Sequence, residues 1–273
     1  MKVAAWAEEL GFSSVWVSDH VVLPDRDRIR SQYPYSPDGQ WPSEADSNQW
    51  DALTVLTWVG AAAPKLMLGT AVLVLPLRNP VLVAKQAATI QLLTGGRLLL
   101  GIGAGWMREE FELIGAQFEG RGPRVDEMVQ LMRALWSGKR VEFEGQSYQL
   151  RGGTMRPALE KPVPILWGGH SEATFRHVAR TGDGWQPLAL TIPLLEAGIK
   201  RIRQLCAEYG RDPGSVPVIA SPGRAFELTV EACRRLEELG IDQVMMGSSF
   251  REPDLSDYRE EMRRVAKVCG LGE

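Results

Sequence analysis

Ser18-Asp19-His20 is the first group of residues in this sequence that could do chemistry, and it directly follows the short apolar run at 14–17. Histidine can act as an acid, a base or an electrostatic partner near neutral pH, and Asp19 could orient the imidazole or contact a coenzyme. The alternative is a structural histidine that forms hydrogen bonds within its loop. The chain has only three histidines, and a strand end is a common catalytic position, so we predict that His20 and Asp19 are catalytic.

Gly168-Gly169-His170-Ser171 has the composition of an anion-binding turn between a strand and a helix. Two glycines let the backbone approach a ligand closely, and the free amides at a helix N-terminus attract negative charge. We predict that Gly168, Gly169, His170 and Ser171 bind a coenzyme phosphate, with His170 as a neighbour of the phosphate and not a catalyst. The alternative is a plain strand–helix turn in which Ser171 caps the helix.

A second glycine-rich segment, Gly101-Ile102-Gly103-Ala104-Gly105, is followed by Trp106. A doubly wound dinucleotide-binding sheet would place such a segment at its first strand, whereas here it lies in mid-chain. Trp106 could wall a substrate pocket at a strand end or be an ordinary core tryptophan. Glu109 and Glu110 follow on the next predicted helix and could act as an acid, but carboxylates on a helix surface are usually solvated, and we expect that here. Arg121 and Arg124 could bind anionic groups or pair with nearby acids, and we expect the pairing.

These segments are positioned by helices and short apolar strands that alternate along the whole chain. Strands are predicted near 14–18, 66–75, 97–102, 163–167, 183–187, 216–220 and 243–246. Helices are predicted at 4–10, 51–62, 79–93, 107–115, 123–137, 171–181, 193–209, 228–239 and 255–268, with a hairpin at 141–150. Such repetition predicts a parallel α/β sheet, and a (β/α)₈ barrel fits the number of units better than a doubly wound sheet.

A long polar stretch at residues 24–48 interrupts this alternation, and one domain over residues 1–273 is the economical interpretation. Loops of such length in compact domains are usually lids or binding loops. We therefore expect the substrate to be held under this loop.

Composition excludes several classes of protein. The net charge of −3 argues against nucleic-acid binding. The apolar stretches at 52–64 and 66–77 are each too short to cross a bilayer, and the start MKVAAWAEEL is not a signal peptide. Cys206, Cys233 and Cys269 are far apart in the sequence, so we expect a reducing cytoplasm and neither a metal site nor a disulfide framework. We expect a small-molecule substrate, no membrane or nucleic-acid partner, and a homodimer.

Several motifs occur in an order that resembles the luciferase-like monooxygenase superfamily, and the resemblance spans almost the whole chain. The motifs are Leu68-Gly69-Thr70-Ala71-Val72, Leu77-Arg78-Asn79-Pro80, Ala84-Lys85-Gln86, Gly95-Gly96-Arg97, Gly101-Ile102-Gly103-Ala104-Gly105-Trp106, Glu110-Phe111, Leu135-Trp136, Trp167-Gly168-Gly169 and Gly182-Asp183-Gly184-Trp185. The stretch Tyr33-Pro34-Tyr35-Ser36-Pro37-Asp38-Gly39 is typical of the subgroup whose members use the deazaflavin coenzyme F420.

The resemblance implies a TIM-like barrel with the coenzyme across the carboxyl ends of the strands. It implies that Asp19 and His20 lie beside the reactive carbon of the coenzyme. It also implies that Thr70, Ala71 and Val72 lie behind the central ring, with a non-prolyl cis peptide bond between Ala71 and Val72.

The resemblance leaves three functions open. They are hydride transfer with F420, an FMN-dependent monooxygenase that incorporates molecular oxygen, and coenzyme binding without turnover. One F420-dependent dehydrogenase branch has a glutamate acid where this chain has Trp106, so the sugar-phosphate chemistry of that branch is not expected here.

The start of the chain departs from the pattern of the family. A (β/α)₈ barrel begins with a strand, whereas this chain begins with a predicted helix, and only seven barrel strands are counted. We therefore expect the first strand to be missing and the domain to be N-terminally incomplete. The strands at 14–18 and 243–246 would then have unpaired edges.

Overall fold

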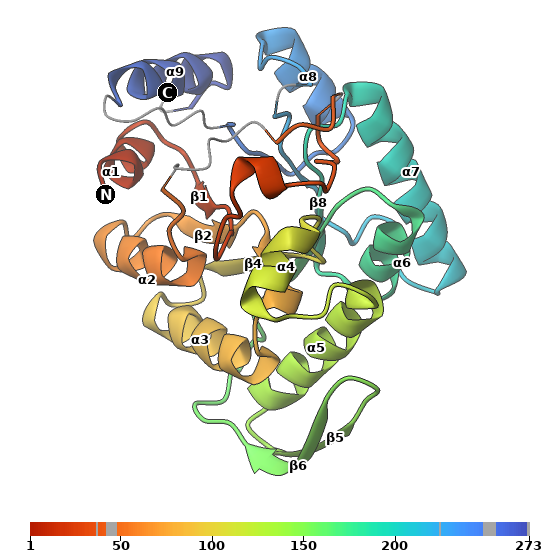
Figure 1. Ribbon diagram of the computed structural model, residues 1–273. Helices are drawn as coiled ribbons and strands as arrows, with labels where there is room; N and C mark the ends of the chain where they lie inside the picture. Colours follow the sequence, from red (N-terminus) through yellow and green to blue (C-terminus); the bar gives the residue numbers. More distant parts are fainter. Residues whose placement is uncertain (37, 42–47, 224, 248–254, 272–273) are drawn as a thin grey trace. The chain divides into compact units, whose positions relative to one another are not determined.

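The computed structural model describes residues 1–36, 38–41, 48–223, 225–247 and 255–271 (Figure 1). Nine α-helices lie in the described residues: α1 (Lys2–Glu9), α2 (Ala52–Ala62), α3 (Pro80–Leu93), α4 (Arg108–Ile114), α5 (Arg121–Trp136), α6 (Glu172–Thr181), α7 (Ile192–Glu208), α8 (Val230–Glu238) and α9 (Ser256–Val268). The strands of the same residues are β1 (Ser14–Val17), β2 (Met67–Thr70), β3 (Leu73–Val74), β4 (Leu98–Gly103), β5 (Arg140–Glu144), β6 (Gln149–Thr154), β7 (Ile165–Gly168), β8 (Gly184–Gln186), β9 (Ile219–Ala220) and β10 (Gln243–Val244).

Helices and strands occur where the sequence pattern predicts them, and all seven predicted barrel strands are present. The strand predicted at 66–75 differs in detail, because it is divided into β2 and β3. The cis peptide bond between Ala71 and Val72 lies at this break, as the family resemblance implied. None of the described helices is long and apolar enough to span a membrane.

The chain divides into two compact units. The middle unit consists of residues 17–61 and 70–164, and the terminal unit consists of residues 1–16, 62–69 and 165–273. Each unit contains parallel strands, short helix–strand connections and its own set of buried apolar side chains.

In the middle unit, β3 pairs in parallel with β4, and Leu73 lies opposite Ile102. Both side chains are fully buried. Helices α3 and α5 pack against each other, and the buried indole of Trp136 donates a hydrogen bond from Nε1 to the carbonyl of Ala84 at 2.9 Å. That bond satisfies the polar atom of a large core side chain, so the tryptophan can be buried at little cost.

Helix α3 begins as its sequence predicts. The side chain of Asn79 accepts hydrogen bonds from the amides of Val81 (2.9 Å) and Leu82 (3.3 Å), and Pro80 occupies the first helical position. Proline has no amide hydrogen to lose there, so the cap and the proline together define where the helix starts.

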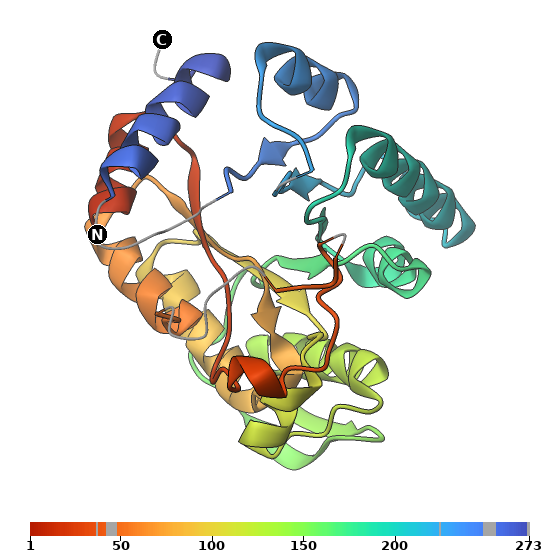
Figure 2. The ribbon, with the colours of Figure 1, turned by 45° about the horizontal axis from the view of Figure 1, so that its top comes forward.

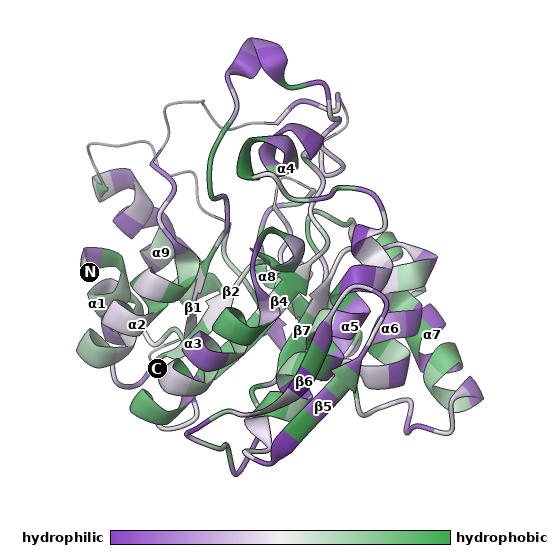
Figure 3. Cartoon of the chain, turned by 60° about the horizontal axis from the view of Figure 1, so that its bottom comes forward, coloured by the Kyte–Doolittle hydropathy of each residue, from purple (hydrophilic) through white to green (hydrophobic). Residues whose placement is uncertain are grey.

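In the antiparallel hairpin of β5 and β6, apolar and charged side chains alternate along β5 (Figure 3). Val141 is buried, whereas its neighbours Arg140 and Glu142 are exposed. One face of the hairpin therefore packs against protein while the other faces water, as alternating sequence predicts.

In the terminal unit, β7 pairs in parallel with β8, and β9 pairs in parallel with β10 (Figure 2). A bridge between Trp185 and Val218 joins β8 to the chain that leads into β9. Trp185 is fully buried, and helices α6 and α7 pack against each other.

Strands β1 and β10, for which we expected unpaired edges, are linked by side chains within the terminal unit. Gln243 donates from Nε2 to the hydroxyl of Ser13 at 2.8 Å, and the hydroxyl of Ser14 donates to Oε1 of Gln243 at 3.3 Å. A single glutamine side chain therefore connects the two strands.

Candidate active site

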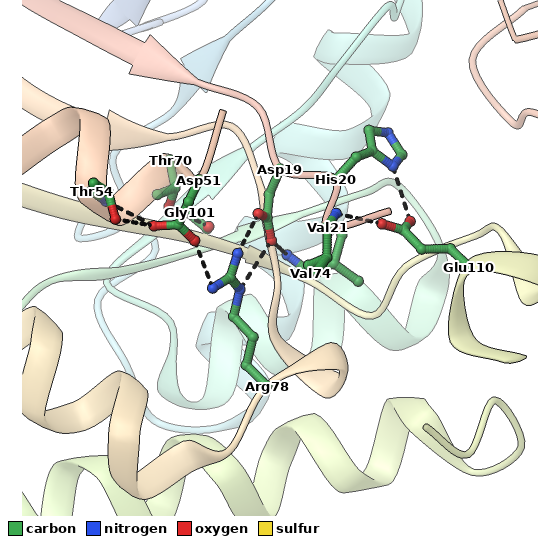
Figure 4. Close-up of polar contacts among 10 residues, drawn as sticks. All are labelled: Asp19, His20, Val21, Asp51, Thr54, Thr70, Val74, Arg78, Gly101 and Glu110. Carbon is green, nitrogen blue, oxygen red and sulfur yellow. Dashed lines mark hydrogen bonds and ion pairs between the residues drawn. The ribbon is translucent and has the colours of Figure 1, made fainter. Parts of the chain in front are cut away.

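His20 is held by a buried carboxylate. It lies three residues after the end of β1, and its Nδ1 is 2.9 Å from Oε2 of Glu110 (Figure 4). The other oxygen of Glu110 accepts the amide of Val21 at 2.7 Å. An ionised Glu110 would accept a hydrogen bond from Nδ1 of His20, which leaves Nε2 as the ring nitrogen outside this contact.

The expectation that Glu110 is a solvated helix carboxylate is wrong. Only 2% of Glu110 is exposed, and the His20 side chain is 12% exposed. Glu110 lies in the first turn of α4 beside Phe111, which is also buried, so this side of the short helix faces inward. The neighbouring phenylalanine was the feature of the sequence that could have indicated this burial. A residue adjacent to an inward-facing Phe111 can itself be buried.

Asp19 has a different set of partners from His20. Its carboxylate is buried and accepts the amide of Val74 at 3.0 Å and Nη2 of Arg78 at 2.7 Å. Both carboxylate oxygens of Asp19 therefore accept hydrogen bonds, one from β3 and one from the segment before α3. Asp19 fixes the backbone that carries His20, while Glu110 orients the imidazole.

Arg78 joins two carboxylates, and sequence reasoning did not assign it a role. Its Nη1 is 2.9 Å from Oδ2 of Asp51, and Nη2 contacts Asp19 (Figure 4). Burial alone would lower the pKa of Arg78, but hydrogen bonds to Asp19 and the charges of both acids outweigh burial and raise the pKa. Asp51 also accepts the amide and the hydroxyl of Thr54 at 2.8 Å, so the network extends to the start of α2.

Glu109 binds the long loop rather than water. Its Oε1 accepts the amides of Arg30 at 2.7 Å and Ser31 at 3.0 Å. Burial tends to raise the pKa of Glu109, but these backbone hydrogen bonds outweigh it and lower the pKa. The hydroxyl of Ser31 in turn accepts the amide of Arg108 at 3.0 Å. The first turn of α4 thus holds His20 through Glu110 and the loop through Glu109.

Trp106 lies in a group of aromatic rings that includes His20. The rings of Trp106 and Trp41 are 6.3 Å apart, and Trp41 is 4.9 Å from the imidazole. Tyr33 packs edge-on against Trp106 at 5.1 Å. Trp106 is half-buried. Its surroundings therefore fit a residue in a pocket wall better than a core residue.

The loop predicted at 24–48 forms a cavity of about 290 Å³ in the middle unit. The cavity is lined by Arg26, Ile29, Arg30, Ser31, Gln32, Asp38, Gly39, Gln40 and Trp41. Trp41, which lines this cavity, also contacts the ring of His20. Pro37 and residues 42–47 of the predicted loop lie outside the described residues.

Among the described residues, Arg121 and Arg124 form no close ion pair of the kind expected, although the charge of Glu119 acts on Arg121. Arg121 donates from Nε to the carbonyl of Gly105 at 3.0 Å, and its guanidinium lies 3.7 Å from the ring centre of Phe118. Arg124 contacts the backbone carbonyls of Gln117 and Glu119. Both arginines therefore hold the segment between α4 and α5, close to the end of β4.

The predicted ring-binding residues lie where β2 ends. Thr70 is fully buried and donates from its hydroxyl to the carbonyl of Gly101 at 2.7 Å. Ala71 and Val72 are half-buried. A Cβ on Gly103 would lie 2.7 Å from Val72 Cγ2, so glycine lets β4 approach this segment closely. The result is a small apolar surface with polar atoms turned inward, which fits one face of a flat ring.

Gly168, Gly169, His170 and Ser171 form the connection from β7 to α6 in the terminal unit. Gly169 has a φ of 100°, and Ser171 caps α6 by accepting the amide of Thr174 at 3.2 Å. His170 is exposed. The cap by Ser171 is the feature expected of the alternative, a plain strand–helix turn, and Gly169 has a conformation that residues with side chains rarely adopt. Phosphate binding at this turn remains a prediction.

Comparisons with known proteins identify the family of this chain. A family model for luciferase-like monooxygenases matches residues 1–226. An uncharacterised protein of Mycobacterium tuberculosis is 36% identical over 252 residues, which is 92% of this chain and 84% of that protein. The F420-dependent glucose-6-phosphate dehydrogenase of Kineococcus radiotolerans is 38% identical over 186 residues, which is 67% of this chain but only 50% of that enzyme.

Among solved structures, the F420-dependent tetrahydromethanopterin reductase of Methanopyrus kandleri has a TM-score of 0.75 and 16% sequence identity. The match covers 98% of this chain and 94% of that reductase. At such identity the likeness concerns the fold alone, and it confirms the predicted α/β class of the luciferase type.

Proposed function

Because this chain belongs to the luciferase-like monooxygenase family, we propose that it is an oxidoreductase that uses F420 for hydride transfer to or from a small organic substrate. The observation that carries the proposal is the bond between His20 and the buried Glu110 at a strand end. Relatives and structural neighbours named as F420-dependent enzymes favour F420 over FMN.

In this proposal, F420 supplies the hydride chemistry when bound, and the protein supplies orientation and proton handling. His20 exchanges a proton with the substrate through Nε2, since Nδ1 is bonded to Glu110. Glu110 keeps the imidazole in one tautomer and stabilises it when it is protonated. Asp19 and Arg78 hold the backbone beside the histidine.

Two segments are proposed to bind the coenzyme. Ala71 and Val72 offer a small apolar surface to the central ring. Gly168, Gly169 and Ser171 offer a glycine turn and a helix N-terminus to the phosphate, which is an arrangement that favours anions.

Trp106 sets the substrate class apart from that of the sugar-phosphate dehydrogenases. The resemblance implies a glutamate acid at this place in that branch, and tryptophan cannot donate or accept a proton in its stead. We propose a substrate with a carbonyl group or an unsaturated bond, held between Trp106 and the loop that carries Trp41.

The activity is tested by mixing reduced F420 with the protein and a panel of carbonyl and unsaturated compounds, and following the return of oxidised F420 absorbance. Catalysed oxidation that depends on one of the compounds supports the proposal. Oxygen consumption with reduced FMN would instead indicate a monooxygenase. Tight F420 binding with no exchange for any compound would indicate a binding protein without turnover.

The proposal includes a homodimer in the cytoplasm. Large apolar side chains are exposed on neighbouring helices of the middle unit: Trp58 on α2 is 65% exposed, and Leu93 on α3 is 73% exposed. Exposed apolar surface of this kind often marks a protein interface. Sedimentation of the wild-type chain and of the Leu93→Glu variant tests this interface. A dimer that is lost in the variant supports the interface, whereas a monomeric wild type contradicts the proposed homodimer.

A further inference from the structure

Two cysteines that are distant in the sequence lie together in the terminal unit. The Sγ atoms of Cys233 and Cys269 are 3.3 Å apart, although 36 positions separate the residues. Cys233 lies in the first turn of α8, and Cys269 is the residue that ends α9. Sequence spacing gave no reason to expect a cysteine pair, because the two helices are brought together only by tertiary packing.

Independent contacts fix the same two segments against each other. Arg264 on α9 donates from Nη1 to the carbonyl of Leu228 at 3.0 Å and lies 3.1 Å from Oε1 of Glu227, just before α8. Glu261 holds the other side of this guanidinium at 2.7 Å. The short distance between the sulfurs is therefore accompanied by polar contacts between α9 and the segment just before α8.

Reagents in solution can reach this pair. Cys269 is exposed and Cys233 is half-buried, whereas Cys206, the third cysteine, is fully buried. Partial burial of its sulfur and the contact with Cys233 raise the pKa of Cys269 to about 12. A nucleophilic cysteine normally has a lowered pKa. The case for reaction between Cys269 and Cys233 therefore rests on the distance between their sulfurs and not on an activated thiol.

We propose that Cys233 and Cys269 form a modification site, a dithiol that low-molecular-weight disulfides convert to an internal disulfide linking α8 to α9. One thiol attacks the small disulfide and releases one reduced small thiol. The second thiol then attacks the mixed disulfide and releases the other. Two protons and two electrons leave the cysteines, and the small disulfide is reduced to two thiols.

The modified protein differs from the reduced protein mainly in its stability. A disulfide that closes a loop of this length restricts the unfolded chain and ties the last helix to the rest of the terminal unit. We therefore expect oxidation to raise the thermal midpoint, and the reductant dithiothreitol to reverse the change.

The test uses the full-length chain and oxidised glutathione as the probe. After exposure, the protein is quenched in acid, unfolded, alkylated and analysed by intact mass and peptide mapping. We expect one alkylated cysteine, Cys206, a peptide pair linked through Cys233 and Cys269, and a higher thermal midpoint. The matched variants Cys233→Ser and Cys269→Ser should each keep one glutathione on the remaining partner and show no rise.

Three results would overturn the proposal. Wild-type protein could keep glutathione on both cysteines, or both could remain alkylatable after long exposure. Alternatively, the disulfide could form without any rise of the thermal midpoint, which would show that it does not hold α9 against α8.

Discussion

In the proposed mechanism, His20 exchanges a proton with the substrate through Nε2, because Nδ1 contacts Glu110. Replacing His20 with alanine removes this path while leaving the segments proposed to bind the coenzyme intact. We expect turnover to fall by about a hundredfold or more, the usual scale for lost acid–base catalysis, with little change in F420 affinity. Steady-state kinetics and a binding titration measure the two effects, and unchanged turnover would remove His20 from the mechanism.

Glu110 and Glu109 are adjacent, but they hold different parts of the site, which allows a matched comparison. Glu110→Gln keeps the size of the side chain yet can no longer hold the imidazole in one tautomer by charge. We expect kcat to fall at least about tenfold, on the scale of a weakened acid–base group. Glu109→Gln can still accept the amides of Arg30 and Ser31, and we expect its kcat to stay within about twofold of wild type.

The pair of variants separates a positioning role from a general loss of structure. Both proteins are first checked for the same thermal midpoint. Equal kcat values for Glu110→Gln and Glu109→Gln would show that the bond to His20 does not matter for turnover.

At the scale of elements, Asp51 connects the start of α2 to Arg78. Burial tends to raise the pKa of Asp51, but hydrogen bonds from Thr54 and the charge of Arg78 outweigh it and lower the pKa. A lowered pKa means that ionised Asp51 stabilises the fold above the ordinary aspartate pKa of about 3.9. That stabilisation is lost as the pH falls through the lower pKa of the folded protein.

Two substitutions divide the contribution of Asp51. Asp51→Asn keeps the helix cap but removes the charge, and we expect a loss of about 0.5–1 kcal/mol in the free energy of unfolding at pH 7. Asp51→Ala also removes the cap and should cost about 1 kcal/mol more. Urea unfolding at several pH values measures both, and the gap between wild type and Asp51→Asn should narrow as the pH falls below the ordinary aspartate pKa and through the lower pKa of the folded protein. A gap that is constant with pH would contradict the role of the charge.

The turn from β7 to α6 carries another prediction. Gly169→Leu places a side chain where the anion is proposed to approach the helix amides, and we expect F420 affinity to fall at least about tenfold. Gly169 has a φ of 100°, so any side chain also strains the backbone. Gly210→Leu is the control, because Gly210 has a φ of 70° and open space around it. Equal affinities in the two variants would place the phosphate elsewhere.

Most elements were predictable from sequence, because apolar periodicity and helix caps act locally. Asn79 and Ser171 cap their helices as their residue types predict. The partners of the site were not predictable in the same way. His20 and Glu110 are 90 positions apart, and the two cysteines are 36 positions apart, so both pairs depend on how helices pack after folding. One missed detail was local, since the buried Phe111 beside Glu110 indicated an inward-facing side of α4.

At the scale of the whole molecule, the family membership and the α/β fold of the luciferase type are established, whereas the coenzyme is a proposal. Members of one fold can use different coenzymes, so the fold alone does not decide between F420 and FMN. The apolar surface proposed for the ring at Ala71 and Val72 does not distinguish one flat ring from the other. The choice depends on binding energy, which a titration measures.

Equilibrium binding of F420 and FMN to the same preparation of the full-length chain tests the central claim most directly. We predict a Kd for F420 at or below about 10 µM and a Kd for FMN at least about tenfold higher, a difference of about 1.4 kcal/mol. Tighter binding of FMN than of F420, or no F420 binding at micromolar concentration, would contradict the assignment of this chain as an F420-dependent oxidoreductase.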